Sequence, residues 1–319
     1  MEELWGGNFM VIEVKNLVKR YGDLIALDHL SFYVKEGEIF GLLGPNGSGK
    51  TTAINCILSL LKYDKGEIKI FSRPMSPDAY DIKRNIGIVM QNVAVYNELT
   101  VYENIDYFCG LYITDRVLKK RMVDEAIEFT GLNDYIKFYP KKLSEGLLRR
   151  LNIACGIAHK PKLIIMDEPT VAVDPQSRNR ILEGILELNR QGATIVYTSH
   201  YMDEVEKICS RIAILDKGKV IAEGTKDELK AMISTGEKIT VEAWNISGDQ
   251  IQRLRNMPSV ISAEYDRPVL TIKSDKGRNN LEEVLTFLRN ENIQFGKIYS
   301  ELPTLNDVFL EITGKELRD

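Results

Sequence analysis

Apolar positions along the first two thirds of the chain form unbroken runs, separated by stretches with helical spacing. Runs without polar alternation are typical of strands buried on both faces of a mainly parallel sheet, and they cover residues 39–43, 86–90, 163–167 and 194–198. Between them, apolar residues recur every three or four positions, which predicts helices over about 101–111, 117–130 and 145–159. This alternation predicts an α/β fold with a mixed core sheet.

Two further patterns flank this core. Near the N-terminus, short alternating runs predict an antiparallel β part, with strands at residues 10–15, 28–34 and 66–71. After about residue 235 the order of elements is βαββαβ, which is typical of a small ferredoxin-like α+β domain. Its strands are expected at 238–244, 260–265, 269–273 and 294–299, its helices at 249–257 and 281–292, and a last helix at 304–313. We therefore predict two domains, 1–235 with a helical subdomain at about 92–161, and a C-terminal accessory domain over 236–319.

Composition narrows the range of partners. The 319 residues include 42 Lys and Arg against 46 Asp and Glu, which gives a formal net charge of −4. Because a nucleic-acid-binding domain usually needs a basic surface, no nucleic-acid partner is expected. No apolar run approaches the roughly 20 residues of a membrane span, and the N-terminus does not resemble a signal peptide. If this protein works at a membrane, another chain must supply the span. The cysteines are expected to be reduced core residues of a cytosolic protein: Cys56, Cys109, Cys155 and Cys209.

A glycine-rich stretch follows the apolar run 39–43 and precedes a helical pattern. It matches the spacing GxxxxGK[ST] of a phosphate-binding P-loop, in the strand–loop–helix context that this motif requires. Glycines let backbone N–H groups turn toward phosphate oxygens, and the helix N-terminus adds its positive dipole end. Lys50 is expected to reach the β- and γ-phosphates, and the Thr51 hydroxyl to bind Mg²⁺. The expected phosphate-binding residues are Gly44, Pro45, Asn46, Gly47, Ser48, Gly49, Lys50, Thr51 and Thr52.

A pair of carboxylates follows the apolar run 163–166. Asp167 would lie at the carboxyl end of a buried strand, where α/β sheets bind ligands, and is expected to hold Mg²⁺. Glu168 is next in the chain and is the expected general base for an attacking water. Four apolar residues followed by a carboxylate form the pattern called Walker B.

With these two motifs, the chain resembles ATP-binding cassette (ABC) ATPases over residues of about 10–230. The resemblance implies that Gln91 contacts Mg²⁺ and the attacking water, that His200 contacts the γ-phosphate, and that Tyr21 stacks on adenine. Residues 143–147 stand where the family has its LSGGQ signature, and 173–175 match the end of its D-loop. The signature and D-loop residues expected to bind the nucleotide of a second cassette are Ser144, Gly146 and Asp174.

The signature departs from the family at two positions. Glu145 replaces the first glycine, Leu147 replaces the glutamine, and residues 171–172 of the D-loop read Val-Ala instead of Ser-Gly or Asn-Gly. A carboxylate in the first turn of a helix stabilises it by about 0.3–1 kcal/mol. The same charge facing a triphosphate at about 8 Å would cost on the order of 2 kcal/mol before screening, at an effective dielectric near 20. We expect Glu145 to point outward, or to pair with Arg149 one turn later, and the site to work.

The resemblance implies an ATPase subunit that uses ATP and Mg²⁺ and works with integral-membrane permease subunits on the cytoplasmic face. Two cassettes would close around ATP, as a homodimer or a heterodimer, and reopen after hydrolysis. Residues 303–314 are similar to the end of the accessory domain of drug- and sodium-exporter-type ABC ATPases, which points to export. Residues 92–96 and 99–102 resemble the surface that docks the permease, with a plain core role equally open.

Other classes fit the residues less well. Soluble ABC ATPases that act on ribosomes or DNA usually carry two cassettes, coiled coils or zinc insertions, and this chain has one P-loop. A GTPase or kinase on the same P-loop would leave the other motifs unexplained. A soluble or regulatory ABC ATPase with weak hydrolysis remains an alternative because of the altered signature.

Overall fold

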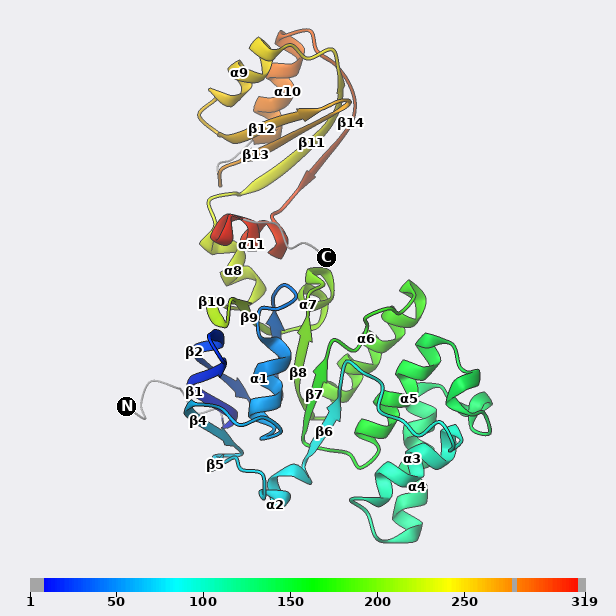
Figure 1. Ribbon diagram of the computed structural model, residues 1–319. Coiled ribbons are helices and arrows are strands. Elements are labelled where there is room, and N and C mark those ends of the chain that lie inside the picture. The colour runs from blue at the N-terminus through cyan, green and yellow to red at the C-terminus, as the bar shows by residue number, and fades with distance from the viewer. Residues whose placement is uncertain (1–8, 277–279, 315–319) are drawn as a thin grey trace. The chain divides into compact units, whose positions relative to one another are not determined.

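The computed structural model describes residues 9–276 and 280–314, which form two compact units (Figure 1). The first unit extends to Thr225 and the second begins at Lys226. The second unit includes helix α8 (Lys226–Met232), which packs against helix α11 (Leu305–Thr313) near the other end of this unit. The sequence pattern missed α8, and the domain boundary expected between residues 235 and 236 stays a prediction.

A sheet with the order β10-β9-β3-β8-β7-β6 forms the centre of the first unit. Its middle strands pair in parallel, and only β10 runs antiparallel, on β9. The carboxyl ends of the parallel strands therefore meet at one edge of the sheet. The strands are β3 (Ile39–Leu43), β6 (Ile86–Val89), β7 (Leu163–Asp167), β8 (Thr194–Ser199), β9 (Arg211–Asp216) and β10 (Lys219–Gly224).

A second, antiparallel sheet has the order β2-β1-β4-β5. Its first two strands are longer than the sequence predicts, because register shifts let them bend while pairing continues beyond the predicted ends. Tyr21, which lies beyond the strand predicted at residues 10–15, is therefore the last residue of β1. The strands are β1 (Met10–Tyr21), β2 (Leu24–Lys35), β4 (Lys65–Ile70) and β5 (Arg73–Pro74).

Helix α1 (Lys50–Ile57) lies between the two sheets (Figure 1), and its buried residues join one core with both of them. Helix α7 (Met202–Ile208) covers the opposite face of the central sheet, where a Cβ on Gly41 of β3 would lie 2.9 Å from Val205. The close approach of this helix explains a glycine in the middle of a buried strand. Other helical segments of this unit are α2 (Tyr80–Lys83), α6 (Pro175–Arg190) and the 3₁₀ turns Asn133–Tyr135 and Pro140–Lys142.

Three helices with their own apolar core form the helical part of the first unit. They are α3 (Val101–Gly110), α4 (Arg116–Thr130) and α5 (Glu145–Ile157), close to the predicted bounds. Thr100 caps α3 in a capping box with Glu103, and Ser144 caps α5 by accepting from the N–H of Leu147. The predicted α/β class is therefore confirmed. The pattern analysis missed β5, β9, β10, α2, α6 and α7.

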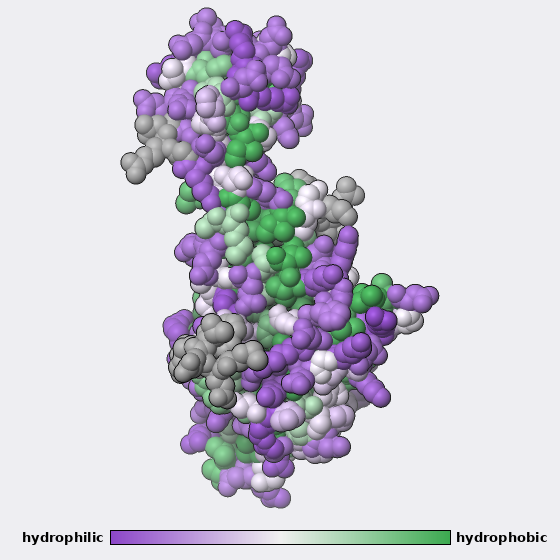
Figure 2. All heavy atoms as spheres, turned by 90° about the vertical axis from the view of Figure 1, so that its left-hand side faces the viewer, coloured by the Kyte–Doolittle hydropathy of each residue, from purple (hydrophilic) through white to green (hydrophobic). Residues whose placement is uncertain are grey.

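The second unit has the predicted βαββαβ order, folded as a four-stranded antiparallel sheet β12-β13-β11-β14. Helices α9 and α10 share one apolar core with this sheet. On the face shown in Figure 2, hydrophilic residues cover most of this unit. Its elements besides α8 and α11 are β11 (Glu237–Trp244), α9 (Gly248–Arg255), β12 (Val260–Asp266), β13 (Val269–Ser274), α10 (Asn280–Asn290) and β14 (Gln294–Glu301). Of the helices in the described part of the chain, none is long and apolar enough to cross a bilayer.

Candidate functional site

A cleft of about 470 Å³ opens at the carboxyl edge of the central sheet. It brings together predicted residues from four separate parts of the chain: the end of β1, the loop after β3, the end of β6 and the end of β7. Its lining includes two exposed apolar residues, Leu24 and Ile25, which the sequence analysis did not select. The predicted residues that line it are Tyr21, Asn46, Gly47, Gly49, Lys50, Thr51, Thr52, Gln91 and Glu168.

The P-loop backbone requires its glycines. Gly47 and Gly49 have φ of 80° and 109°, in the left-handed region that residues with a Cβ adopt at a cost. A Cβ on Gly44 would lie 2.2 Å from the carbonyl oxygen of Leu215, so no side chain fits there. The hydroxyl of Ser48 is buried and has no hydrogen-bond partner among the described residues. An unpaired buried hydroxyl beside turned-in backbone fits a loop that completes its hydrogen bonds with phosphate.

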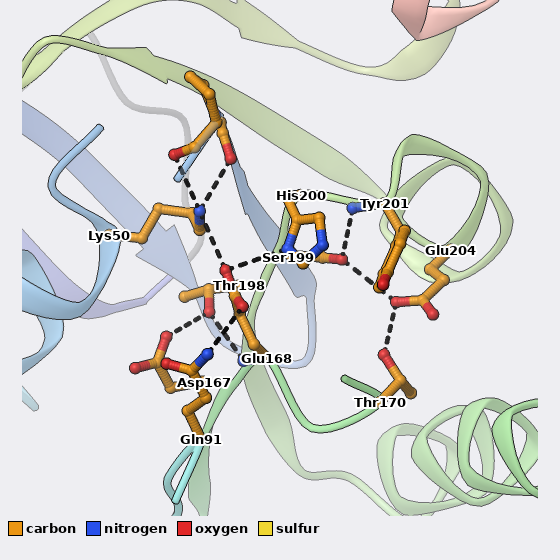
Figure 3. Close-up of polar contacts among 12 residues, drawn as sticks. Lys50, Gln91, Asp167, Glu168, Thr170, Thr198, Ser199, His200, Tyr201 and Glu204 are labelled. Carbon is orange, nitrogen blue, oxygen red and sulfur yellow. Dashed lines mark hydrogen bonds and ion pairs between the residues drawn. The ribbon is translucent and has the colours of Figure 1, made fainter. Parts of the chain in front are cut away.

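Lys50 and Glu168 form a buried ion pair at the base of the cleft, with Nζ 3.1 Å from Oε1 (Figure 3). Their side chains are 4% and 6% exposed, so little water screens this pair. Lys50 also donates to the carbonyls of Gly44 at 2.8 Å and Pro45 at 3.2 Å. The amide of Gln91 donates to Glu168 Oε2 at 3.3 Å, and His200 Nδ1 lies 3.3 Å from Oε1. The structure thus gathers Lys50, Gln91 and His200 around the carboxylate of Glu168, the fourth predicted catalytic residue.

Asp167 is fully buried beside Glu168 and is fixed by β8. Thr198 Oγ1 donates to Asp167 Oδ1 at 2.5 Å and accepts from the backbone N–H of Glu168 at 3.0 Å. The second carboxylate oxygen of Asp167, Oδ2, has no partner among the described residues. Nowhere in the described ranges do three or more His, Cys, Asp or Glu side chains gather as ligands. An unpaired, buried carboxylate oxygen fits a Mg²⁺ ion that would take its remaining ligands from a nucleotide and water.

The predicted signature and D-loop residues lie outside the cleft. Ser144, Gly146 and Asp174 are not among the described residues that line the cleft. Asp174 caps α6 by accepting from the N–H of Ser177 at 2.9 Å, and that hydrogen bond lowers the pKa of its carboxyl. A Cβ on Gly146 would lie 2.5 Å from Ser177 Oγ, so the first turns of α5 and α6 are in close contact. Ser144, Gly146 and Asp174 therefore gather at one place, the N-termini of α5 and α6.

Glu145 is half exposed, with Oε1 3.9 Å from Arg149 Nη2 one turn later, as the outward orientation requires. Arg149 itself is buried, and its Nη1 donates to the carbonyl of Gln91 at 2.6 Å. The sequence analysis named Arg149 only as a partner of Glu145 and missed this second contact. Ala172 adopts φ of 61°, where the family pattern places glycine. The alanine in the D-loop therefore holds a backbone conformation that costs a residue with a Cβ more than it costs glycine.

The structure adds functional residues that motif reasoning missed. Lys217 lines the cleft from the loop after β9. Glu204, on α7, is 3% exposed and accepts hydrogen bonds from residues on both sides of the site. A signal for Glu204 was present, because it is one helical turn after His200 among apolar residues. A carboxylate on an apolar face is unusual unless it has buried partners.

Family models and curated relatives match this chain. The family described as ABC transporter matches residues 27–171, and the family described as ATP-binding protein DrrA1-3-like, C-terminal domain, matches residues 224–313. The chain is 38% identical to the linearmycin resistance ATP-binding protein LnrL of Bacillus subtilis, covering 97% of this chain and 100% of that protein. It is 32% identical to the daunorubicin resistance ATP-binding protein DrrA3 of Streptomyces coeruleorubidus, covering 96% and 97%. It is also 32% identical to the Nod factor export ATP-binding protein I of Ralstonia nicotianae, covering 98% and 97%.

Solved structures give the same result for the first unit. An ATP-binding subunit of an ABC transporter aligns with a TM-score of 0.64 and 28% identity, over 70% of this chain and 92% of that one. The ATP-binding cassette MJ0796, in a dimeric post-hydrolysis state bound to ADP and Pi, aligns with a TM-score of 0.62 and 28% identity, over 67% and 98%. These matches show that this chain belongs to the ABC transporter ATP-binding proteins, as an ABC ATPase with a DrrA-like C-terminal domain.

Proposed function

We propose that this protein is the ATP-hydrolysing subunit of a membrane ABC exporter, and that two cassettes close around ATP to drive transport. The observation that carries the proposal is the convergence of Lys50, Gln91 and His200 on the carboxylate of Glu168, which lines the P-loop cleft together with Lys50 and Gln91. A lysine would supply positive charge and a histidine ring a hydrogen-bond donor where phosphate would lie, and the carboxylate would supply a base.

Each residue has a role in this proposal. The P-loop amides and Lys50 bind the phosphates, which requires Lys50 to leave its ion pair with Glu168. The freed Glu168 takes a proton from the attacking water, and His200 contacts the γ-phosphate. Thr51, Gln91 and Asp167 would hold Mg²⁺, which would neutralise charge on the phosphates. Tyr21, 49% exposed at the rim, offers its ring face to the adenine.

The site needs a second cassette to be complete. Ser144, Gly146 and Asp174 lie at helix N-termini apart from the cleft, so in this proposal they serve the ATP of the partner cassette. Ser144 caps α5, and the N–H groups and dipole of that helix favour an anion there. Hydrolysis would remove the γ-phosphate that both cassettes hold, and the dimer would open.

The names of the relatives, which specify resistance and export, support the proposal of an exporter. We propose permease subunits as partners, with this chain on the cytoplasmic face of the membrane. Of the docking surface expected at residues 92–96 and 99–102, Val101 and Tyr102 begin α3 and pack in its apolar core. The segment before α3 supports docking for the rest. Its Tyr96 is 46% exposed and packs edge-on against exposed Tyr107, while buried Asn104 holds its backbone through hydrogen bonds to Tyr96 and Leu99.

The test uses two variants of the catalytic pair. Glu168→Gln should bind ATP, release little phosphate and form a stable dimer with ATP and Mg²⁺ in size-exclusion chromatography. If that variant stays monomeric, the dimerisation mechanism is wrong. Lys50→Ala should lose tight nucleotide binding, and an unchanged affinity would remove the P-loop assignment.

A second function, a regulatory cassette with weak hydrolysis, is favoured by Glu145 alone. Phosphate release by the wild-type chain separates the two functions, with Glu168→Gln as the background control. A wild-type rate equal to that of Glu168→Gln would support the regulatory cassette. A wild-type rate well above it would support the ATPase.

A further inference from the structure

A buried carboxylate on α7 contacts three segments around the proposed catalytic pair, and no catalytic role above uses it. Glu204 is 3% exposed. Its Oε2 accepts hydrogen bonds from the hydroxyls of Tyr197 at 2.7 Å, Thr170 at 2.8 Å and Ser199 at 3.2 Å. Thr170 is two residues after Glu168, and Ser199 directly precedes His200 (Figure 3). One oxygen atom therefore joins the segment of the proposed base to the segment of the switch histidine.

Oε2 is the shared acceptor of the surrounding hydroxyl groups. Three hydroxyl groups converge on this single oxygen, and charged acceptors hold hydrogen bonds about twice as strongly as neutral ones. Burial raises the pKa of the Tyr197 phenol, and the nearby Glu204 carboxylate raises it further, so Tyr197 remains a donor. The hydroxyl of Ser199 also accepts from the backbone N–H of Tyr201 at 2.9 Å. This hydrogen bond extends the network across both neighbours of His200.

The other carboxylate oxygen faces a cation from a different helix. Arg178 Nε lies 3.3 Å from Glu204 Oε1, and its guanidinium lies 4.8 Å from the ring centre of Tyr201. Arg178 is one residue after Ser177, which contacts Gly146 of the signature turn. The carboxylate thus also reaches the helix that supports the proposed trans half of the site. Without Arg178, Glu204 would be a buried charge with no ionic partner, which is costly.

We propose that Glu204 is a positioning residue that fixes the Glu168 and His200 segments relative to each other and to α6. This inference rests on the proposed function, since it assigns Glu204 an effect on ATP turnover. Glu204 acts through Thr170, Ser199 and Arg178. Misplacement of reacting groups by about 1 Å can cost roughly 100-fold in rate, so a network of this kind affects turnover strongly.

Glu204→Gln is a sharp test because the amide cannot satisfy both sides. If its oxygen replaces Oε2, its NH₂ faces Arg178, and two donors oppose each other. If it is rotated, the NH₂ faces the three hydroxyls. We expect phosphate release by the full chain at saturating ATP to fall at least tenfold, with KM for ATP within about threefold of wild type. A loss of folded protein would also lower the measured rate at unchanged KM, so the rate is expressed per folded chain, with the folded fraction measured by circular dichroism.

Asp203→Asn is the matched control, because it removes the same charge from an exposed position next to Glu204. It should stay within twofold of the wild-type rate. An unchanged rate for folded Glu204→Gln would overturn the inference. An equal loss in Asp203→Asn would also overturn it, since the effect would then come from charge on α7.

Two further variants keep the outcome decisive. If Glu204→Gln does not fold, Arg178→Lys replaces it, because it keeps a cation beside the buried carboxylate of Glu204 and removes the planar guanidinium. It should lower the rate at least threefold at unchanged KM, and an unchanged rate would overturn the inference. Glu168→Gln is measured in parallel. If it keeps the wild-type rate, the proposed function itself is wrong, whatever Glu204→Gln does.

Discussion

Replacing Glu145 by glutamine removes the charge that departs from the signature and keeps the shape of the side chain. The structure sets the size of the effect. A half-exposed carboxylate 3.9 Å from Arg149 contributes about 0.3–0.5 kcal/mol as a helical pair, and its charge near the helix N-terminus about 0.3–1 kcal/mol. Together they amount to about 1 kcal/mol, which corresponds to a fall in Tm of about 2–4 °C for a unit of this size.

The effect on turnover separates two orientations of this charge. A carboxylate facing a triphosphate at about 8 Å would cost on the order of 2 kcal/mol, a rate factor of about 30. In the structure the carboxylate is half in solvent and beside a guanidinium, so we expect Glu145→Gln to change phosphate release by less than about threefold. Steady-state phosphate release and a thermal melt measure both quantities. Glu128→Gln, an exposed glutamate on α4, is the control for a simple change of net charge. A rise in rate of tenfold or more would refute the outward orientation and identify Glu145 as a brake.

Three other predictions test the surroundings of the site. Burial lowers the pKa of His159 from 6.5 to about 4, so stability is complete above pH 6.5 and falls as pH drops toward 4, by about 2 kcal/mol at pH 5. Between pH 7.5 and pH 5, the free energy of unfolding in urea should fall by about 2 kcal/mol less for His159→Gln than for wild type. The exposed variant His29→Gln should show the same fall as wild type. Gly146→Ala places a Cβ 2.5 Å from Ser177 Oγ, so phosphate release should fall at least tenfold, and Ser177→Gly in the same chain should restore part of it. Asn104→Ala leaves several backbone groups of the loop before α3 unpaired, at a cost of about 2–4 kcal/mol, and hydrogen exchange in that loop should rise.

Each of these has an opposing result. Equal pH dependence in His159→Gln and wild type would mean that this imidazole titrates normally in the folded protein. A Gly146→Ala variant with full activity would mean that α5 and α6 separate easily. Unchanged exchange in Asn104→Ala would mean that the docking segment is held by its aromatic contacts instead.

The sequence predicted the parts of the fold and site that depend on local patterns. Unbroken apolar runs located the parallel strands β3, β6, β7 and β8 because burial on both faces leaves no alternation. The fixed spacing of the P-loop identified its residues, because this spacing produces the backbone turn that presents N–H groups to phosphate. β9 was missed although its apolar residues 212–215 form the same kind of buried run. β10 was missed because its apolar run at 220–222 is only three residues long, and α7 because seven residues give too short a helical period.

Residues that act through distant contacts were beyond such reasoning. Arg149 contacts the carbonyl of Gln91, 58 positions away, and Glu204 contacts Thr170, 34 positions away. No local pattern encodes a partner at that separation, since the sheet order decides which strand ends meet. The charge of each residue was visible in the sequence, and its burial was not.

The ion pair between Lys50 and Glu168 has a consequence for affinity, separate from turnover. It makes Glu168 an internal competitor of the nucleotide, because the lysine must exchange one anion for another before it binds phosphate. Glu168→Gln would weaken this competitor and so tighten binding of any nucleotide, including an analogue that cannot be hydrolysed. The stability of a trapped dimer would then reflect a changed binding equilibrium as well as a missing base. The same carboxylate would set how long ATP is held and how fast it is split.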